Sequence, residues 1–179
     1  RSEVNDLRHQ VQTDALTGLY NFRFFSNILP LEMERTRRAA QPLSLIILDI
    51  DNFKQFNDRW GHELGNQALV HVSQLIAQTI RKLDFACRFG GEEFILVEQH
   101  NIGSDPSMLN IPKLFSQLAI EHKSSPFGVV TASLGIITLQ HTETSLSSST
   151  LMQQADNLLY QAKNNGRNQA KSSILSAVL

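Results

Sequence analysis

Two pairs of closely spaced carboxylates are the side chains in this sequence best suited to chemistry. Glu92 and Glu93 follow two glycines in the segment Gly-Gly-Glu-Glu-Phe at residues 90–94, and Asp49 and Asp51 close an apolar run. An aspartate at the end of a buried strand is costly to desolvate unless it is paired, hydrogen-bonded or bound to a metal. If the fold brings Asp49 to Glu92, their oxygens can hold a hard cation, for which Mg²⁺ is the best match.

The glutamates are expected at the mouth of a β-hairpin. Residues 85–89 and 94–97 can pair as antiparallel strands around a two-residue Gly-Gly loop. Residues 43–48 are almost continuously apolar, which indicates a strand buried on both faces. Taken alone, the Gly-Gly turn is equally consistent with a solvated surface turn. The second acidic pair is what favours a metal site.

Periodicity and capping residues predict the surrounding elements. Asn21 is the expected N-cap of a helix that runs to about residue 40, which Pro30 is expected to kink or interrupt. Further helices are expected at residues 53–59, 63–82, 111–122 and 151–163, and further strands at residues 128–139 and 172–174. These elements predict an α/β (α+β) fold in which a mixed central sheet of about five strands is flanked by helices.

Length and charge exclude several classes of protein. The 179 residues, 41% of them hydrophobic, suffice for one well-cored domain. Because 16 Lys and Arg stand against 17 Asp and Glu, no broad positive field favours nucleic acid or an anionic membrane. A single cysteine, Cys87, excludes an internal disulfide. No apolar run approaches the roughly 20 residues that span a bilayer, so we expect a cytoplasmic segment without membrane contact.

The first residues are expected to end a helical stalk. Val4, Leu7 and Val11 recur at spacings of three and four, as in a coiled coil or an ordinary amphipathic helix. Because the chain starts at Arg1, we expect it to be a piece of a longer protein. The expected organisation is a stalk at residues 1–13 and one domain at residues 14–175.

Five short motifs follow one another along the chain. They are Asp-Ala-Leu-Thr-Gly-Leu-Tyr-Asn at 14–21, Asp-Ile-Asp-Asn-Phe-Lys at 49–54, Asn-Asp-Arg-Trp-Gly-His at 57–62, Arg-Phe-Gly-Gly-Glu-Glu-Phe at 88–94 and Ala-Lys-Asn-Asn-Gly-Arg-Asn at 162–168. In order and spacing they resemble the GGDEF diguanylate cyclases, whose fold is similar to that of nucleotidyl cyclases and the polymerase palm.

The resemblance implies an activity and its partners. Two domains of a homodimer would face each other, each with one GTP, and condense the pair to cyclic di-GMP with loss of two pyrophosphates. It also implies two Mg²⁺ or Mn²⁺ ions per active site. An upstream sensory domain is expected in the full-length protein, which is either free in the cytoplasm or anchored to the membrane.

The resemblance assigns the metal-binding and catalytic residues. Asp49 and Glu92 match metal ligands, with the Ile50 carbonyl as an additional one, and Glu92 is also the candidate general base. Glu93 is either a support for the metal or the incoming hydroxyl, or a structural hydrogen-bonding residue. Lys54 would add electrostatic stabilisation of the phosphates.

Nucleotide contacts are expected on three segments. Backbone N–H groups at the start of the helix that follows Asp49 form a ready anion site. By themselves, Lys163 and Arg167 are also consistent with a solvated helix face, and His62 with a capping or core histidine. The residues expected to bind the nucleotide are Asn52, Phe53, Lys54, Asn57, His62, Asn66, Lys163 and Arg167.

The chain departs from the family pattern at Asn66, where that pattern has Asp. A carboxylate accepts both the N1–H and N2–H protons of guanine, whereas an amide offers one acceptor and an NH₂ that faces a donor. We therefore expect weaker guanine binding with GTP still preferred. Relaxed selectivity with some mixed GMP–AMP product is the alternative.

Arg81 and Asp84 fit the family's Arg-x-x-Asp inhibitory site, which binds product dimers, although a basic helix end followed by a turn explains the tetrapeptide equally well. Two other functions fit the sequence less well. One is a catalytically silent cyclic di-GMP receptor, which the complete set of acidic and basic site residues disfavours. The other is a polymerase-type nucleotidyl transferase, which the charge balance disfavours because it would need a basic template groove.

Overall fold

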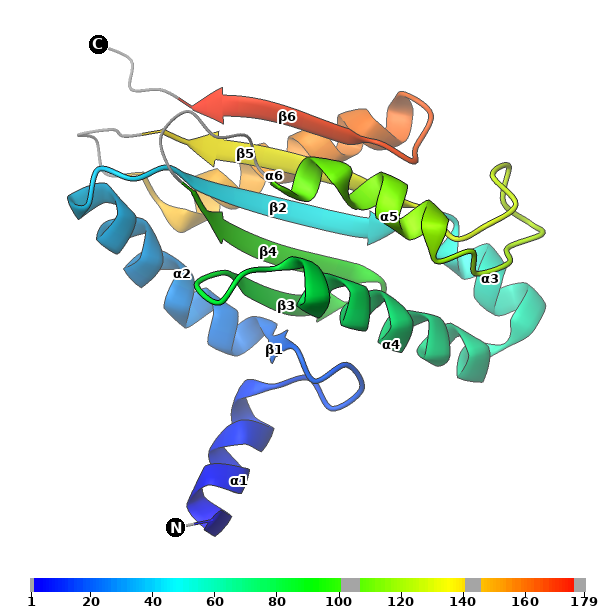
Figure 1. Cartoon of the computed structure of the whole chain (residues 1–179), viewed down its shortest axis with the longest axis horizontal. Helices are drawn as coiled ribbons and strands as arrows, with labels where there is room; N and C mark the ends of the chain where they lie inside the picture. Colours follow the sequence, from blue (N-terminus) through cyan, green and yellow to red (C-terminus); the bar gives the residue numbers. More distant parts are fainter. Residues whose placement is uncertain (1, 101–106, 141–145, 176–179) are drawn as a thin grey trace.

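A mixed six-stranded sheet forms the centre of the computed structural model, which describes residues 2–100, 107–140 and 146–175 (Figure 1). The strands lie in the order β1-β3-β4-β2-β5-β6. The pairs β3–β4, β4–β2 and β2–β5 are antiparallel, while β1–β3 and β5–β6 are parallel. Their bounds are β1 Tyr20–Asn21, β2 Leu43–Ile50, β3 Phe85–Gly90, β4 Glu93–Gln99, β5 Ala132–Leu139 and β6 Ala170–Leu175.

Helices cover both faces of this sheet. They are α1 Ser2–Gln12, α2 Phe22–Arg38, α3 Phe53–Trp60, α4 His62–Thr79, α5 Ile111–Gln117 and α6 Ser148–Asn164, with a 3-10 turn at Ser107–Asn110. In Figure 1, α4 and α5 lie in front of the sheet and α6 behind it, while α1 extends away from the body.

Strand β2 is the middle of the core, since all eight of its residues are buried. Ile46 and Leu48 belong to one hydrophobic cluster, with apolar side chains of α3, α4 and α5. Leu45 and Ile47 belong to a second cluster, with side chains of α2 and α6. This arrangement confirms the prediction of a strand buried on both faces, and it makes β2 a rigid support for Asp49 at its end.

The mixed sheet and flanking helices confirm the predicted fold class, and Asn21 caps α2 as predicted by accepting a bond from the Phe24 N–H at 2.9 Å. One strand was missed. Strand β1 has two residues and pairs with β3, so it has too few residues to show an alternating pattern. Pro30 does not interrupt α2, which continues through it.

Several element ends differ from the predicted ones. Helix α5 ends at Gln117 rather than residue 122, because Ala119 takes a left-handed conformation with φ 52° and Glu121 then bridges Val129. The hairpin turn is displaced by one residue, since Gly90 pairs with Glu93 and leaves Gly91 and Glu92 at the tip. The expected helix at 63–82 stops at Thr79, and the expected strand at 128–139 begins at Ala132.

Candidate active site

The two acidic pairs meet at one end of the sheet. In the register of β2 and β4, Asp49 lies opposite Glu93. The next residue, Ile50, donates its N–H to the Glu92 carbonyl at 3.3 Å. Asp49 is buried, while Glu92 and Glu93 are half-buried. The structure thus brings together the residues predicted to bind metal.

Lys163 completes this acidic cluster. It lies at the end of α6, and its Nζ forms an ion pair with Asp49 Oδ2. Burial raises the pKa of the Asp49 carboxyl; Lys163 lowers it, and the charges of Glu92 and Asp51 raise it further, so that the net shift is upward. Burial, and to a smaller extent the charge of Asp49, likewise raise the pKa of Glu93. These carboxylates are destabilised as anions, and a bound cation would relieve that cost.

The buried Asp51 carboxylate links neighbouring segments of the chain by hydrogen bonds and is not free to bind a metal ion. Its Oδ1 accepts from Ser133 Oγ at 2.6 Å, and its Oδ2 accepts from Thr131 Oγ1 at 2.8 Å and from the Asn168 N–H at 3.0 Å. The Asp51 N–H donates to the Thr131 carbonyl at 2.8 Å. These bonds fix the turn that carries Arg167 against the end of β2. The sequence pattern pointed to Asp51 but did not predict any of these partners.

The turn between β2 and α3 carries the residues of the predicted anion site. Asn52 takes a left-handed conformation with φ 53°, which Asn tolerates better than most residues. The N–H groups of the first turn of α3 have no acceptor within that helix. Lys54 is exposed on the same turn. The buried Asn52 Nδ2 has no hydrogen-bond partner among the described residues.

The predicted nucleobase contacts lie on two adjoining helices. Asn57 is on α3, and its buried Oδ1 lacks a hydrogen-bond partner within the described ranges. Asn66 is exposed on α4 and lines a cavity of about 490 Å³ with Leu16, Glu63 and Val70. His62, the first residue of α4, is exposed, which contradicts its interpretation as a core histidine.

An ion pair joins the first motif to the hairpin. Arg88 Nη1 lies 3.3 Å from Asp14 Oδ2, and Arg88 Nη2 donates to the Gly91 carbonyl at 2.9 Å. Asp14 also accepts from the Thr17 N–H at 2.9 Å. Although burial raises the pKa of Asp14, the Thr17 and Arg88 bonds hold it below its usual value. Arg88 therefore fixes the tip of the hairpin that carries the glutamates.

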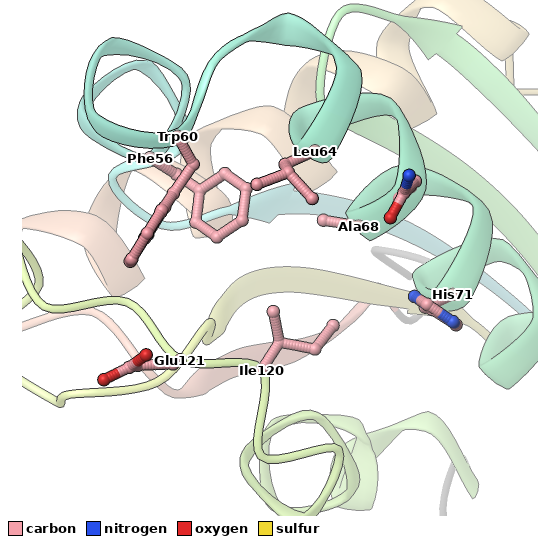
Figure 2. Close-up of a pocket in the computed structure, with 8 residues that line it drawn as sticks. Phe56, Trp60, Leu64, Ala68, His71, Ile120 and Glu121 are labelled. Carbon is pink, nitrogen blue, oxygen red and sulfur yellow. The ribbon is translucent and has the colours of Figure 1, made fainter.

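A second cavity, of about 300 Å³, lies between α3, α4 and the segment that carries Ile120 and Glu121 (Figure 2). Figure 2 shows Phe56 and Trp60 of α3 and Leu64 of α4 facing Ile120 across it. Trp60 packs partly against the hydrophobic cluster of α3 and α4, as predicted for a packing residue. None of the predicted site residues lines this cavity.

Arg81 and Asp84 lie at the opposite end of β2 and β4, beside Gln99. Asp84 is buried, and it accepts from the Arg81 N–H at 2.8 Å and the Gln99 N–H at 3.1 Å. Arg81 Nε lies 3.6 Å from Asp84 Oδ2. The two residues contribute to a cavity of about 390 Å³ with Arg35, Gln41, Lys82, Leu83, Gln99 and His100.

The donor set suits a hard cation. Within the described ranges no three His, Cys, Asp or Glu side chains are grouped as a ready metal site. The predicted site needs only two carboxylates and the Ile50 carbonyl, with further oxygens from phosphates, which is the usual pattern for Mg²⁺. The mutually repelling carboxylates of buried Asp49 and half-buried Glu92 fit such an ion. Among the same residues, none of the helices combines the length and apolarity that crossing a bilayer requires.

The family model described as "Diguanylate cyclase, GGDEF domain" matches residues 11–169. The chain belongs to this family. Among curated relatives, the diguanylate cyclase DgcS of Shewanella oneidensis is 37% identical over 171 residues, which is 96% of this chain and 56% of DgcS. The response regulator PleD of Caulobacter vibrioides is 32% identical over 176 residues, which is 92% of this chain and 37% of PleD. The chain therefore spans about half or less of these relatives.

Solved structures place the chain in the same GGDEF fold. The coiled coil and GGDEF domain of DgcB from Caulobacter crescentus, in complex with c-di-GMP, has a TM-score of 0.85 at 29% identity and covers 97% of this chain and 91% of its own. The active GGEEF domain of a diguanylate cyclase from Vibrio cholerae has a TM-score of 0.72 at 31% identity, covering 87% of this chain and 98% of its own.

Proposed function

We propose that this GGDEF domain condenses two GTP molecules into cyclic di-GMP and two pyrophosphates, with one GTP on each of two facing domains. The observation that carries the proposal is the meeting of Asp49, Glu92 and Glu93 at one end of the sheet, with Lys163 against them. The solved domain described as an active GGEEF domain shares the pentapeptide of residues 90–94. DgcS, 37% identical, is named a diguanylate cyclase.

In the proposed reaction, the ribose 3′-oxygen of one GTP attacks the α-phosphorus of the other. A new P–O bond forms, the bond from that phosphorus to the β-phosphate bridging oxygen breaks, and pyrophosphate leaves. The 3′-hydroxyl proton passes to Glu92 as general base, with Glu93 supporting the hydroxyl. The reciprocal attack closes the ring.

The remaining site residues bind and neutralise the triphosphate. The N–H groups of Asn52, Phe53 and Lys54 bind phosphate oxygens, and the Lys54 and Lys163 cations offset their charge. Arg167 lies in the turn that Asp51 fixes through the Asn168 N–H, so its side chain is available at the same edge. Mg²⁺ or Mn²⁺, two per site, held by Asp49, Glu92 and the Ile50 carbonyl, supplies charge neutralisation and activation of the hydroxyl.

Base recognition is assigned to Asn57 and Asn66, with His62 as a flanking nucleotide contact. The unpaired Asn57 Oδ1 supplies an acceptor for guanine N–H groups. Asn66 presents an amide where a carboxylate would take both guanine protons. A second candidate function follows from Asn66, namely a cyclase with relaxed base selectivity that also makes some mixed GMP–AMP product.

Dimerisation and regulation are assigned to two further regions. Val4, Leu7 and Val11 of α1 are 56%, 61% and 63% exposed, so residues 1–13 fit the end of a coiled-coil stalk that brings two domains at 14–175 together. The similar DgcB structure contains a coiled coil. Arg81 and Asp84 form a product site for cyclic di-GMP. An upstream sensory domain acts through the stalk, and the segment itself works in the cytoplasm.

The decisive experiment incubates the chain at high concentration with Mg²⁺ and GTP, ATP or both, and identifies products by mass. Glu92→Gln is the inactive control. Cyclic di-GMP from GTP in the wild type alone supports the proposal, and a GMP–AMP product in the mixture supports relaxed selectivity. Tight binding of cyclic di-GMP without any cyclic dinucleotide formed would contradict the proposal and favour a silent receptor.

A further inference from the structure

His122 lies outside every sequence motif and is completely buried, with 0% of its surface exposed. Its Nε2 lies 2.8 Å from the carbonyl oxygen of Asn52, 70 residues away in the chain. A carbonyl oxygen can only accept, so Nε2 carries the proton and donates it. The other ring nitrogen, Nδ1, has no hydrogen-bond partner among the described residues. The bond to the Asn52 carbonyl is therefore the hydrogen bond that this ring makes among the described residues.

The Asn52 carbonyl belongs to the peptide group whose N–H, on Phe53, is part of the predicted phosphate site. It also accepts the first bond of α3, from the Phe56 N–H at 3.1 Å. Because the peptide unit is planar and trans, the Asn52 carbonyl and the Phe53 N–H point in opposite directions. Holding the carbonyl toward His122 therefore aims the Phe53 N–H away from the core. Such support stabilises the left-handed conformation of Asn52, which Asn adopts more readily than most residues but less readily than Gly.

The segment that carries His122 is itself rigidly closed. The Val130 N–H donates to the Ile120 carbonyl at 2.8 Å, and the His122 N–H donates to the Gly128 carbonyl at 2.9 Å. The ring packs edge-on against Phe56, with centroids 5.4 Å apart and planes at 88°. In Figure 2, Ile120 of this segment faces the side chains of α3 and α4. The histidine is thus held from both sides.

The same segment also holds the residue before Asn52. Thr131 follows directly on Val130, and it binds Asp51 through both its carbonyl and its hydroxyl. Two consecutive residues of the β2–α3 turn, Asp51 and Asn52, are therefore fastened to one closed segment of the chain. Such a double attachment fixes the orientation of the peptide that joins Asn52 to Phe53.

We propose that His122 is a positioning residue for the triphosphate of GTP, which it orients by fixing the Asn52 carbonyl and thereby the N–H groups of Phe53 and Lys54. The inference rests on the proposed function, because it takes the nucleotide to bind at this turn. His122 contacts no substrate itself. It acts through the peptide plane.

The test compares three substitutions that separate the hydrogen bond from the packing. His122→Gln can replace Nε2 by an amide N–H of similar reach, whereas His122→Asn is polar but too short. His122→Leu fills the core without a donor. Thr138→Val is the matched control, since it removes a buried hydroxyl bonded to Ser44 at the far end of β2. Calorimetry gives the dissociation constant of Mg²⁺·GTP, turnover gives kcat and KM, and thermal unfolding gives Tm.

We expect Mg²⁺·GTP affinity and kcat/KM to fall about tenfold to hundredfold in the Asn and Leu variants. The Gln variant should stay within about threefold of the wild type, although Leu should have the higher Tm because it buries no polar group. Thr138→Val should bind GTP normally. If the Leu variant fails to fold, the Gln and Asn pair decides.

Two results would overturn the inference. One is equal GTP affinity in the Gln, Asn and Leu variants, and the other is affinity that simply follows Tm, as core filling alone would predict. The proposed function fails separately: a wild type that binds Mg²⁺·GTP but forms no cyclic dinucleotide contradicts the cyclase, while the binding series still decides the role of His122. A wild type that does not bind Mg²⁺·GTP overturns both.

Discussion

The side chain of Asn57 lies directly over Gly65. A methyl group at position 65 would come within 1.8 Å of Asn57 Oδ1, and this oxygen is buried without a hydrogen-bond partner among the described residues. The close approach of α3 to α4 at Gly65 therefore makes room for an unpaired acceptor beside the predicted nucleobase site. An unpaired buried acceptor is costly unless a ligand satisfies it.

We expect Gly65→Ala to weaken Mg²⁺·GTP binding about tenfold, because losing one hydrogen bond of this kind costs about 1 kcal/mol or more. The new methyl group must push the Asn57 side chain aside. Stability should hardly fall, since Ala favours a helix interior over Gly by about 1 kcal/mol. Asn57→Ala and the double variant provide the control: the double variant should lose no more affinity than Asn57→Ala alone. If the losses of Mg²⁺·GTP affinity in the two single variants add up in the double variant, Gly65→Ala does not act through the Asn57 side chain.

Asn66→Asp should increase discrimination for GTP over ATP by about tenfold to a hundredfold, because a hydrogen bond to a charged acceptor is worth roughly 1.5–3 kcal/mol and the carboxylate can accept both guanine protons. Competition assays with both nucleotides give the ratio of kcat/KM values. Gln74→Glu, which adds the same charge at an exposed residue of α4 outside the cavity that Asn66 lines, is the control and should leave the ratio unchanged. An unaltered ratio in Asn66→Asp would refute the role of residue 66 in selectivity.

Asp49→Asn should abolish activity, a larger loss than the roughly tenfold to hundredfold that removal of an outer-shell partner causes. The same change should raise Tm at neutral pH. Burial raises the pKa of Asp49 in the folded state, so its ionisation favours unfolding, and stability is lost as the pH rises through the ordinary and then the raised pKa.

Thermal unfolding of wild type and Asp49→Asn across the pH range checks this prediction without Mg²⁺. The Tm difference should be near zero below the ordinary carboxylate range and should favour the variant above the raised pKa. Asp6→Asn, which removes an exposed carboxylate on α1, is the control and should show no such widening. A variant less stable at neutral pH would show that the Lys163 ion pair outweighs the burial of Asp49.

Arg81→Ala should raise the cyclic di-GMP concentration that half-inhibits the enzyme by at least about tenfold, because a charged hydrogen bond to phosphate is worth roughly 1.5–3 kcal/mol. Inhibition is measured relative to the uninhibited rate of each variant. Lys123→Ala removes the same charge from an exposed residue that pairs with Glu121, and it should leave the inhibition curve in place. Equal curves for wild type and Arg81→Ala would exclude this product site.

Gly135→Ala should destabilise the domain by roughly 3 kcal/mol, the upper range for overpacking of a core. A Cβ atom there would lie 2.1 Å from the Ala155 carbonyl and 2.4 Å from the Leu159 nitrogen, and backbone cannot rotate away. The Tm should drop by roughly 6–12 °C. Ser173→Ala, an exposed change on neighbouring β6, serves as the control. A Tm within about 2 °C of the wild type would contradict this packing.

Much of the fold follows from local patterns in the chain. The apolar run of β2, the Asn21 cap and the β3–β4 hairpin each depend on neighbouring residues. The structure confirms all three, with the hairpin turn one residue later than the predicted Gly-Gly loop. Strand β1 could not be predicted from the sequence, because two residues are too few to show a periodic pattern. The strand is stabilised by its pairing with β3. The end of α5 is also set by tertiary contacts, since Glu121 bridges Val129.

The sequence by itself determined which chemical groups this protein carries: carboxylates at a strand end and a hairpin, basic residues in the last turn of α6 and just after it, and an amide at position 66. Only the tertiary structure decided which of these groups meet. Lys163 reaches Asp49 across 114 residues, and His122 reaches Asn52 across 70. Such pairs depend on strand register and on the packing of helices against the sheet, and neither leaves a periodic signal in the chain. His122 belongs to no sequence motif, so its proposed positioning role emerges only from its contact with the Asn52 carbonyl in the folded structure.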